Sequence, residues 1–311
     1  MNNDFNKKLC IKIIFITAIV GLIFAIALFT ISRLADMRSN NDTAKKASDS
    51  MTLVPTKKAV NTPTAAPTSK ETPTPEAEPT KSIELLANLD SIDAGTIIEE
   101  DELDFNDLSK YFKSYEISDD IFERIYGDNK SYKTYCTVPR EDLRYLKLLH
   151  RGFDGNIHVG ELIVNKVIAD EILEIFTILF QNDYQIESMY LVDDFDADDR
   201  SSIDANNTSA FNFRTITDNP DVLSYHAMGV AIDINPINNP YIWLDENGSW
   251  TYEDRDAELY LDRDAVDAAE RHMINHDDLC YKLFIERGYT WGGDWDDPKD
   301  YQHFEKAVVN Y

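Results

Sequence analysis

Two short segments of the chain contain residue types that can bind a metal ion. The first is Ser224–Asn235, SYHAMGVAIDIN, in which His226 lies seven residues before Asp233. The second is Tyr289–Glu305, YTWGGDWDDPKDYQHFE, whose one histidine is His303. Zinc accepts imidazole and carboxylate ligands, and a catalytic zinc usually has three protein ligands and a fourth position for water. The three side chains are therefore candidate zinc ligands, although a His-x6-Asp pair by spacing alone is more often a surface or core pair.

A strand is the element that would present the acidic ligand. Ala231–Asn235 alternates in hydropathy as a strand does. Successive side chains of a strand point to opposite faces, so Ile232 and Ile234 would lie in the core while Asp233 points into a site. Gly229 comes just before this strand, and its missing side chain would let the chain turn closely.

The second segment also contains candidates for proton transfer. Asp300 lies three residues before His303 and is the candidate general base for the attacking water. Glu305 lies two residues after His303, shares its face if the segment is a strand, and is the rival for that role. Trp291 and Trp295 flank a glycine pair and suggest an aromatic wall beside a cleft. The four remaining histidines are interpreted as structural or solvent-exposed: His150, His158, His272 and His276.

The elements around these segments predict a mixed fold. Leu162–Phe180 has apolar residues at helical spacing, and Ala265–Glu286 is a second helix candidate closed by Arg287–Gly288. Met189–Val192 is a short strand candidate. Strands and helices are mixed without a βαβ rhythm, so the predicted class is α+β with a small antiparallel sheet flanked by helices.

The N-terminal part has a different composition. Ile13–Ser32 is a run of twenty residues without a charge, and as a helix it would span about 30 Å, the thickness of a bilayer core. We interpret it as a membrane anchor with the N-terminus inside, because lysines precede it and no clear cleavage site follows; a cleaved signal peptide is the alternative. Residues 40–82 are rich in Pro and Thr and are predicted to be a disordered linker.

Charge divides the chain further. Residues 1–82 carry a net charge of +4 and the remaining residues −31, which together give −27. Such an acidic field repels nucleic acid and anionic lipid surfaces, and argues against both as partners. We predict four segments: a cytoplasmic tip with a transmembrane anchor at 1–39, the linker at 40–82, an acidic lead-in at 83–116, and the domain with the candidate site at 117–311.

Cysteine is sparse in the acidic part. Cys136 and Cys280 could form a disulfide outside the cell, but free buried cysteine is the common alternative. No Cys-x-x-Cys or Cys/His cluster occurs, so a zinc site built from cysteines is excluded.

The two segments resemble motifs of a known family. Ser224–Asp233 is similar to the S-x-H-x-x-G-x-A-x-D motif of the M15 zinc D,D-peptidases, the VanX/VanY-like family. The stretch WGGDW followed by DYQHFE resembles that family's second motif. GFDGNIHVGELIVN at 152–165 and NNTSAFNFR at 206–214 resemble blocks of the VanY-like branch. The resemblance covers residues 117–311.

The resemblance implies a fold and roles for particular residues. The fold would be the small α+β domain of hedgehog and D,D-peptidase type. Zinc would be held by His226, Asp233 and His303, with Asp300 as the base. Arg214, which ends NNTSAFNFR, would contact the substrate carbonyl or carboxylate, and Ser224 would support the site through hydrogen bonds. The sequence departs from the pattern in two places: the base is Asp, as in the endopeptidase-like branch, and TDNPDV at 217–222 lacks an expected glycine.

These implications lead to an expected function. The chain is expected to be a zinc metallopeptidase that hydrolyses peptidoglycan stem peptides as a D-alanyl-D-alanine carboxypeptidase, with its catalytic domain outside a single-pass membrane anchor. A peptidoglycan endopeptidase of L-Ala-D-Glu type is the alternative within the same chemistry. A non-catalytic cell-wall-binding or signalling module is the alternative from another class.

Overall fold

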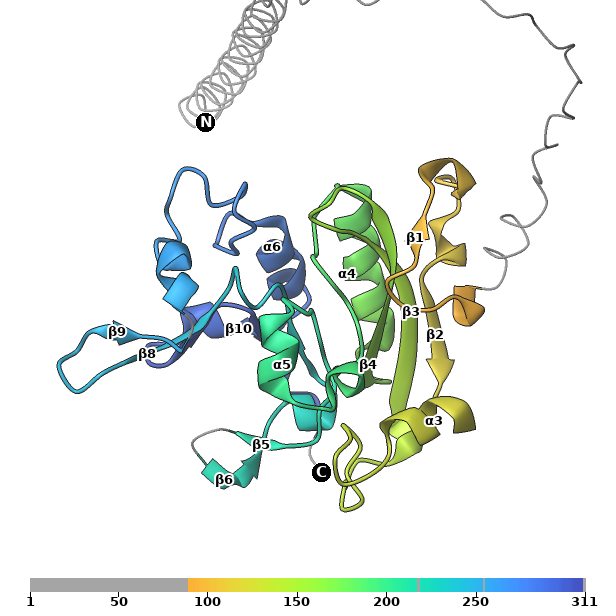
Figure 1. Ribbon diagram of the computed structural model, residues 1–311, viewed down its shortest axis with the longest axis horizontal. Coiled ribbons are helices and arrows are strands. Elements are labelled where there is room, and N and C mark those ends of the chain that lie inside the picture. Colours follow the sequence, from red (N-terminus) through yellow and green to blue (C-terminus); the bar gives the residue numbers. More distant parts are fainter. Residues whose placement is uncertain (1–88, 217–218, 254, 310–311) are drawn as a thin grey trace, which may run out of the picture. The chain divides into compact units, whose positions relative to one another are not determined.

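The structure is a computed structural model that describes residues 89–216, 219–253 and 255–309 (Figure 1). The predicted anchor at Ile13–Ser32 and the predicted linker at 40–82 lie outside these residues. Among the residues that are described, none of the helices combines the length and the apolar character needed to cross a bilayer.

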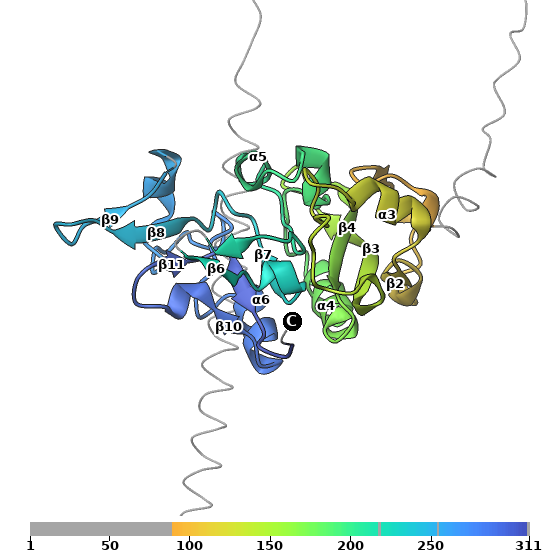
Figure 2. The same ribbon diagram turned by 90° about the horizontal axis from the view of Figure 1, so that it is seen from below.

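The largest sheet has four antiparallel strands in the order β1-β4-β3-β2. Its centre is a long hairpin of β3 (Leu143–Arg151) and β4 (Ile157–Asn165), and β1 (Ile97–Ile98) and β2 (Lys113–Glu116) form its edges. Helix α4 (Ala169–Gln181) packs against β3 and buries its apolar side in the main core. Figure 2 shows this sheet with α4 beside it and the smaller strands grouped on the opposite side of the molecule.

The four-stranded sheet includes part of the segment that was interpreted as an acidic lead-in. Strands β1 and β2 both come from residues 83–116 and pair with β4 and β3. Leu108, Tyr111 and Phe112 from the same segment are buried in the main core. Residues 89–116 are therefore structurally continuous with the domain that follows them.

Two of the predicted elements have different bounds in the structure. The helix predicted at Leu162–Phe180 starts only at Ala169, because Leu162–Asn165 pair with β3 as the end of β4. The helix predicted at Ala265–Glu286 is reduced to α6 (Leu279–Glu286), and turns precede it. His272 has a φ of 56°, which a helix does not accept. Asp278 starts α6 by accepting hydrogen bonds from the N–H groups of Cys280 and Tyr281.

The strand predicted at Met189–Val192 is absent. The backbone N–H of Tyr190 donates to Asn207 Oδ1 at 2.8 Å, and the Asn207 amide donates back to the Tyr190 carbonyl at 3.0 Å. A side-chain amide thus replaces the ladder bonds that a neighbouring strand would supply. Val192 begins a 3-10 turn that ends at Phe195.

Three small antiparallel sheets position the candidate site. The first has the order β10-β12-β7, the second β11-β8-β9, and the third is the hairpin β5-β6. Their bounds are Thr290–Trp291 (β10), His303–Glu305 (β12), Ala231–Asp233 (β7), Lys299–Asp300 (β11), Tyr241–Leu244 (β8), Trp250–Thr251 (β9), Thr215–Ile216 (β5) and Asn219–Leu223 (β6). Two further short helices are α3 (Asp119–Ile125) and α5 (Asp199–Asp204).

The predicted α+β class is confirmed, since the described residues form small antiparallel sheets and few helices, whereas the hedgehog and D,D-peptidase type stays a prediction. The strand predicted at Ala231–Asn235 is present as β7, which ends at Asp233, and Ile232 and Ile234 are fully buried as predicted. Cys136 and Cys280 are both free thiols.

Candidate active site

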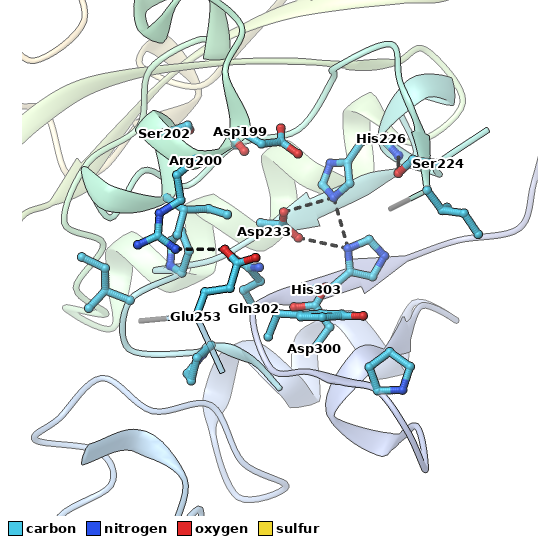
Figure 3. A pocket seen from close by; sticks show the side chains of 18 of the residues that line it. Asp199, Arg200, Ser202, Ser224, His226, Asp233, Glu253, Asp300, Gln302 and His303 are labelled. Carbon is cyan, nitrogen blue, oxygen red and sulfur yellow. Dashed lines mark hydrogen bonds and ion pairs between the residues drawn. The ribbon is translucent and has the colours of Figure 1, made fainter. Parts of the chain in front are cut away.

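The three predicted ligands lie together at one end of the small sheets (Figure 3). His226 Nε2 is 3.2 Å from Asp233 Oδ2 and 3.1 Å from His303 Nδ1, and His303 Nδ1 is 3.0 Å from Asp233 Oδ1. Of the His, Cys, Asp and Glu side chains in the described residues, these three form a group that could hold a metal ion. Their ligand atoms lie within 4.8 Å of one another. Both imidazoles are buried.

Strand register brings two of the ligands together. In the β7–β12 pair His303 is directly opposite Asp233, and directly opposite residues of antiparallel strands project from the same face. The pairing of Phe304 with Ile232 anchors the opposite face in the core, where both are fully buried. The strand pairing thus brings His303 and Asp233, which are 70 positions apart in the sequence, to hydrogen-bond distance.

The third candidate ligand, His226, is held by a tight turn. His226 begins a 3-10 turn that ends at Gly229, whose φ is 69°. A Cβ at Gly229 would lie 2.8 Å from the backbone nitrogen of Asn165, which donates to the Gly229 carbonyl at 2.7 Å. Only glycine combines this conformation with so close an approach to β4. The Ser224 hydroxyl accepts a hydrogen bond of 3.2 Å from the His226 N–H and so braces the start of the turn.

Hydrogen bonds at the back of each imidazole determine which nitrogen faces the centre. His226 Nδ1–H donates to the Ala210 carbonyl at 2.5 Å, so that Nε2 presents its lone pair to the group. His303 Nε2–H donates to Glu305 Oε2 at 3.0 Å, and Nδ1 faces the group. Metal-binding histidines usually donate their other N–H to a carbonyl or carboxylate in this way.

The pKa values of Asp233 and His303 are shifted by the groups beside them. Burial would raise the pKa of Asp233, but the two histidines beside it hold that pKa well below its usual range. Burial lowers the pKa of His303, yet hydrogen bonds to Asp233 and Glu305 outweigh it and raise the pKa to about 10. Two imidazole nitrogens and a carboxylate are a donor set that fits zinc. The second ring nitrogen of each histidine is already hydrogen-bonded, as is usual for metal-binding histidines.

Asp300 lies on β11 and lines the same pocket. Its Oδ1 is shielded from solvent and accepts no hydrogen bond from the described residues. Burial, together with the negative charge of Asp233, raises the pKa of Asp300 to about 6. A Cβ at Gly292 would lie 2.4 Å from the Asp300 carbonyl oxygen, so this glycine of WGGDW is what lets the strand pass so closely. An unpartnered carboxylate oxygen is suited to accept a proton.

The two tryptophans of this segment have different surroundings. Trp295 lines the pocket, and its ring centroid is 5.5 Å from that of His303. Trp291 was predicted beside the cleft, but it is buried in the core and its Nε1–H donates to the Tyr301 carbonyl at 2.8 Å. It therefore supports the turn between Asp300 and His303 from behind.

The pocket has a volume of about 530 Å³ and includes residues that sequence reasoning missed. Arg214, predicted from the resemblance, lies on its wall, and Arg214 Nε forms an ion pair with Asp199 Oδ2 at 2.5 Å. Asp199 and Arg200 come from α5, and Tyr241 and Trp243 come from β8. The sequence contained no signal for the α5 residues, because only the fold brings that helix to the pocket. Tyr241 stands opposite Asp300 in the β8–β11 register.

Comparison with known proteins tests the resemblance in part. No match was found among curated proteins or among solved structures. The blocks at 152–165 and 206–214, on which the VanY-like branch was predicted, lie outside the segment 217–306 that matches a family model, so that branch stays a prediction. Residues 217–306, less than a third of the chain but including all three candidate ligands and Asp300, match the family model Peptidase_M15_4, described as D-alanyl-D-alanine carboxypeptidase, and this segment is thus similar to M15 peptidases.

Proposed function

We propose that the chain is a zinc-dependent peptidase that cleaves peptidoglycan stem peptides as a D-alanyl-D-alanine carboxypeptidase. One observation carries the proposal. His226, Asp233 and His303 converge in a pocket beside an unpartnered oxygen of Asp300, and all four residues lie inside the segment similar to M15 peptidases.

The chain's own residues would divide the chemistry among them. Zinc held by the two histidines and Asp233 would supply Lewis acidity, which polarises the scissile carbonyl and acidifies water. Asp300 Oδ1 would accept a proton from the attacking water and pass it to the amine that leaves when the C–N bond breaks. Arg214, held by Asp199, would place positive charge where the carbonyl oxygen becomes negative.

The endopeptidase alternative is supported by one feature, the aspartate at the base position, which resembles the endopeptidase-like branch. A non-catalytic module has no comparable support, because the candidate ligands and the base are all present and converge.

Digestion of purified peptidoglycan by the full-length, zinc-loaded protein tests the function. Mass spectrometry of the products should detect released D-alanine and stem peptides shortened by one residue. Release of fragments cut between L-Ala and D-Glu would assign the endopeptidase activity instead. Intact peptidoglycan and intact soluble stem peptides after prolonged incubation would reject the peptidase proposal.

We further propose that Ile13–Ser32 tethers the enzyme to the cell membrane, with residues 40–311 outside and the linker at 40–82 carrying the domain into the wall. The support is the uncharged run and the Pro- and Thr-rich composition that follows it. N-terminal sequencing of the protein from membranes should find the uncleaved start. A mature protein that begins near residue 36 and is recovered from the medium would identify a signal peptide instead.

A further inference from the structure

We infer that Arg200 binds the free C-terminal carboxylate of the substrate, and that this carboxylate displaces Glu253 from Arg200. The inference rests on the proposed function and deepens it. It identifies the Arg200–Glu253 ion pair on the pocket wall as the feature that selects peptides with a free C-terminus.

The pocket lining contains two arginines, and they are held very differently. Arg214 forms an ion pair of 2.5 Å with Asp199, and Asp199 in turn accepts a hydrogen bond of 2.8 Å from the Asn212 amide. About a third of the Arg214 side chain is exposed. Because its carboxylate partner is itself hydrogen-bonded, Arg214 is positioned for a role toward a developing charge.

Arg200 is the next residue of α5 after Asp199, and it forms ion pairs with two exposed carboxylates. Its Nη2 is 2.7 Å from Asp204 Oδ1, and its Nη1 is 3.3 Å from Glu253 Oε2. The side chains of Asp204 and Glu253 are 52% and 73% exposed. Ion pairs between exposed side chains contribute little to stability and exchange readily. The Arg200–Glu253 pair, with an N–O distance of 3.3 Å and a Glu253 side chain that is 73% exposed, can therefore give way to a ligand carboxylate with little loss.

The Arg200–Glu253 pair also occupies a suitable place. Arg200 comes from α5, whereas Glu253 follows β9, so the pair joins two different walls of the pocket. Figure 3 shows the two side chains facing each other at the side of the pocket away from His226, with Asp233 between. A substrate that lies across the metal-binding group can thus extend its end toward Arg200.

The surrounding charge makes a cation necessary for this recognition. Five carboxylates line the pocket against the two arginines: Asp199, Asp233, Glu253, Asp300 and Glu305. A terminal carboxylate would be repelled by most of this wall. A guanidinium can donate two parallel N–H bonds to a carboxylate, which gives Arg200 a geometric preference for the charged end of a peptide. A peptide with an amidated C-terminus lacks that charge and would leave Glu253 in place.

The test compares two synthetic stem peptides that differ only at the end: one has a free D-Ala-D-Ala carboxylate and the other is its C-terminal amide. With the zinc-loaded full-length enzyme, kcat/KM should be about 10- to 100-fold higher for the acid. Arg200→Ala should raise KM for the acid by about the same factor while the amide changes little, and Arg200→Lys should restore part of the loss. Glu253→Gln should lower KM for the acid, because it removes the competing carboxylate.

Arg287→Ala is the matched control, since Arg287 pairs with the exposed Glu174 outside this pocket. Equal turnover of acid and amide by the wild type would reject the inference and leave the peptidase function standing. Equal losses on both substrates in Arg200→Ala, or a higher KM for the acid in Glu253→Gln, would also reject it. A wild-type enzyme inactive on both peptides and on peptidoglycan would reject the proposed function, and this inference with it.

Discussion

Replacement of His226 or His303 with alanine is expected to remove bound zinc and, with it, measurable peptidase activity. Each imidazole supplies one of the ligand atoms that converge within 4.8 Å. Two ligands seldom hold a catalytic zinc tightly, because each ligand contributes both charge neutralisation and geometry. Wild-type protein purified without added metal should contain close to one zinc ion per chain by elemental analysis, and the two variants close to none.

His276→Ala is the control for these variants, because this histidine is 68% exposed and lies outside the pocket lining. It should keep both zinc and turnover. Circular dichroism of the three variants separates loss of metal from loss of fold. Full zinc occupancy in folded His226→Ala and His303→Ala proteins would show that the metal site has been assigned to the wrong residues.

Asp300→Asn is expected to separate catalysis from metal binding. The amide keeps the size of the side chain but cannot take a proton from water, so turnover should fall by about two to four orders of magnitude. Zinc should stay bound, because Asp300 is not among the converging ligands. Steady-state kinetics and zinc content measured on the same preparation test both parts. Loss of zinc in this variant would instead identify Asp300 as a ligand or its direct support.

Glu305→Gln provides the contrast to Asp300→Asn. Glu305 accepts the hydrogen bond from His303 Nε2, so its main effect should be on the metal. Zinc affinity, measured by competition with a chelator, should fall by about 10- to 100-fold. If Glu305→Gln abolishes turnover of the zinc-saturated protein while Asp300→Asn stays near normal, Glu305 is the base. If both variants stay active, neither carboxylate acts as the base.

Local pattern was sufficient for part of the site. The alternation around Asp233 predicted a strand with two buried isoleucines, and the structure has it. Gly229 before that strand was expected to allow a close turn, and its positive φ beside β4 explains why. These features depend on neighbours within a few residues, which a sequence displays directly.

Local pattern was insufficient where distant partners compete for the backbone. Val164 belongs to the predicted helical stripe, yet it pairs with Arg144 of β3, and α4 begins only at Ala169. The Asn207 side chain satisfies the backbone of Tyr190 and removes the strand predicted there. Long-range pairing of this kind overrides short-range propensity.

The sequence by itself determined the kinds of group available, namely two histidines and an aspartate as candidate ligands and a second aspartate as candidate base, in two segments, and the α+β class. Only the tertiary structure decided how each group is used. The β7–β12 register places His303 opposite Asp233. The hydrogen bond to the Ala210 carbonyl turns His226 Nε2 toward the group, and Glu305 accepts a hydrogen bond from His303. The ion pairs of Arg214 with Asp199 and of Arg200 with Glu253 form because of where α5 lies in the fold. Hydrogen-bond partners are set by distances between segments far apart in the chain, and such distances exist only once the chain has folded.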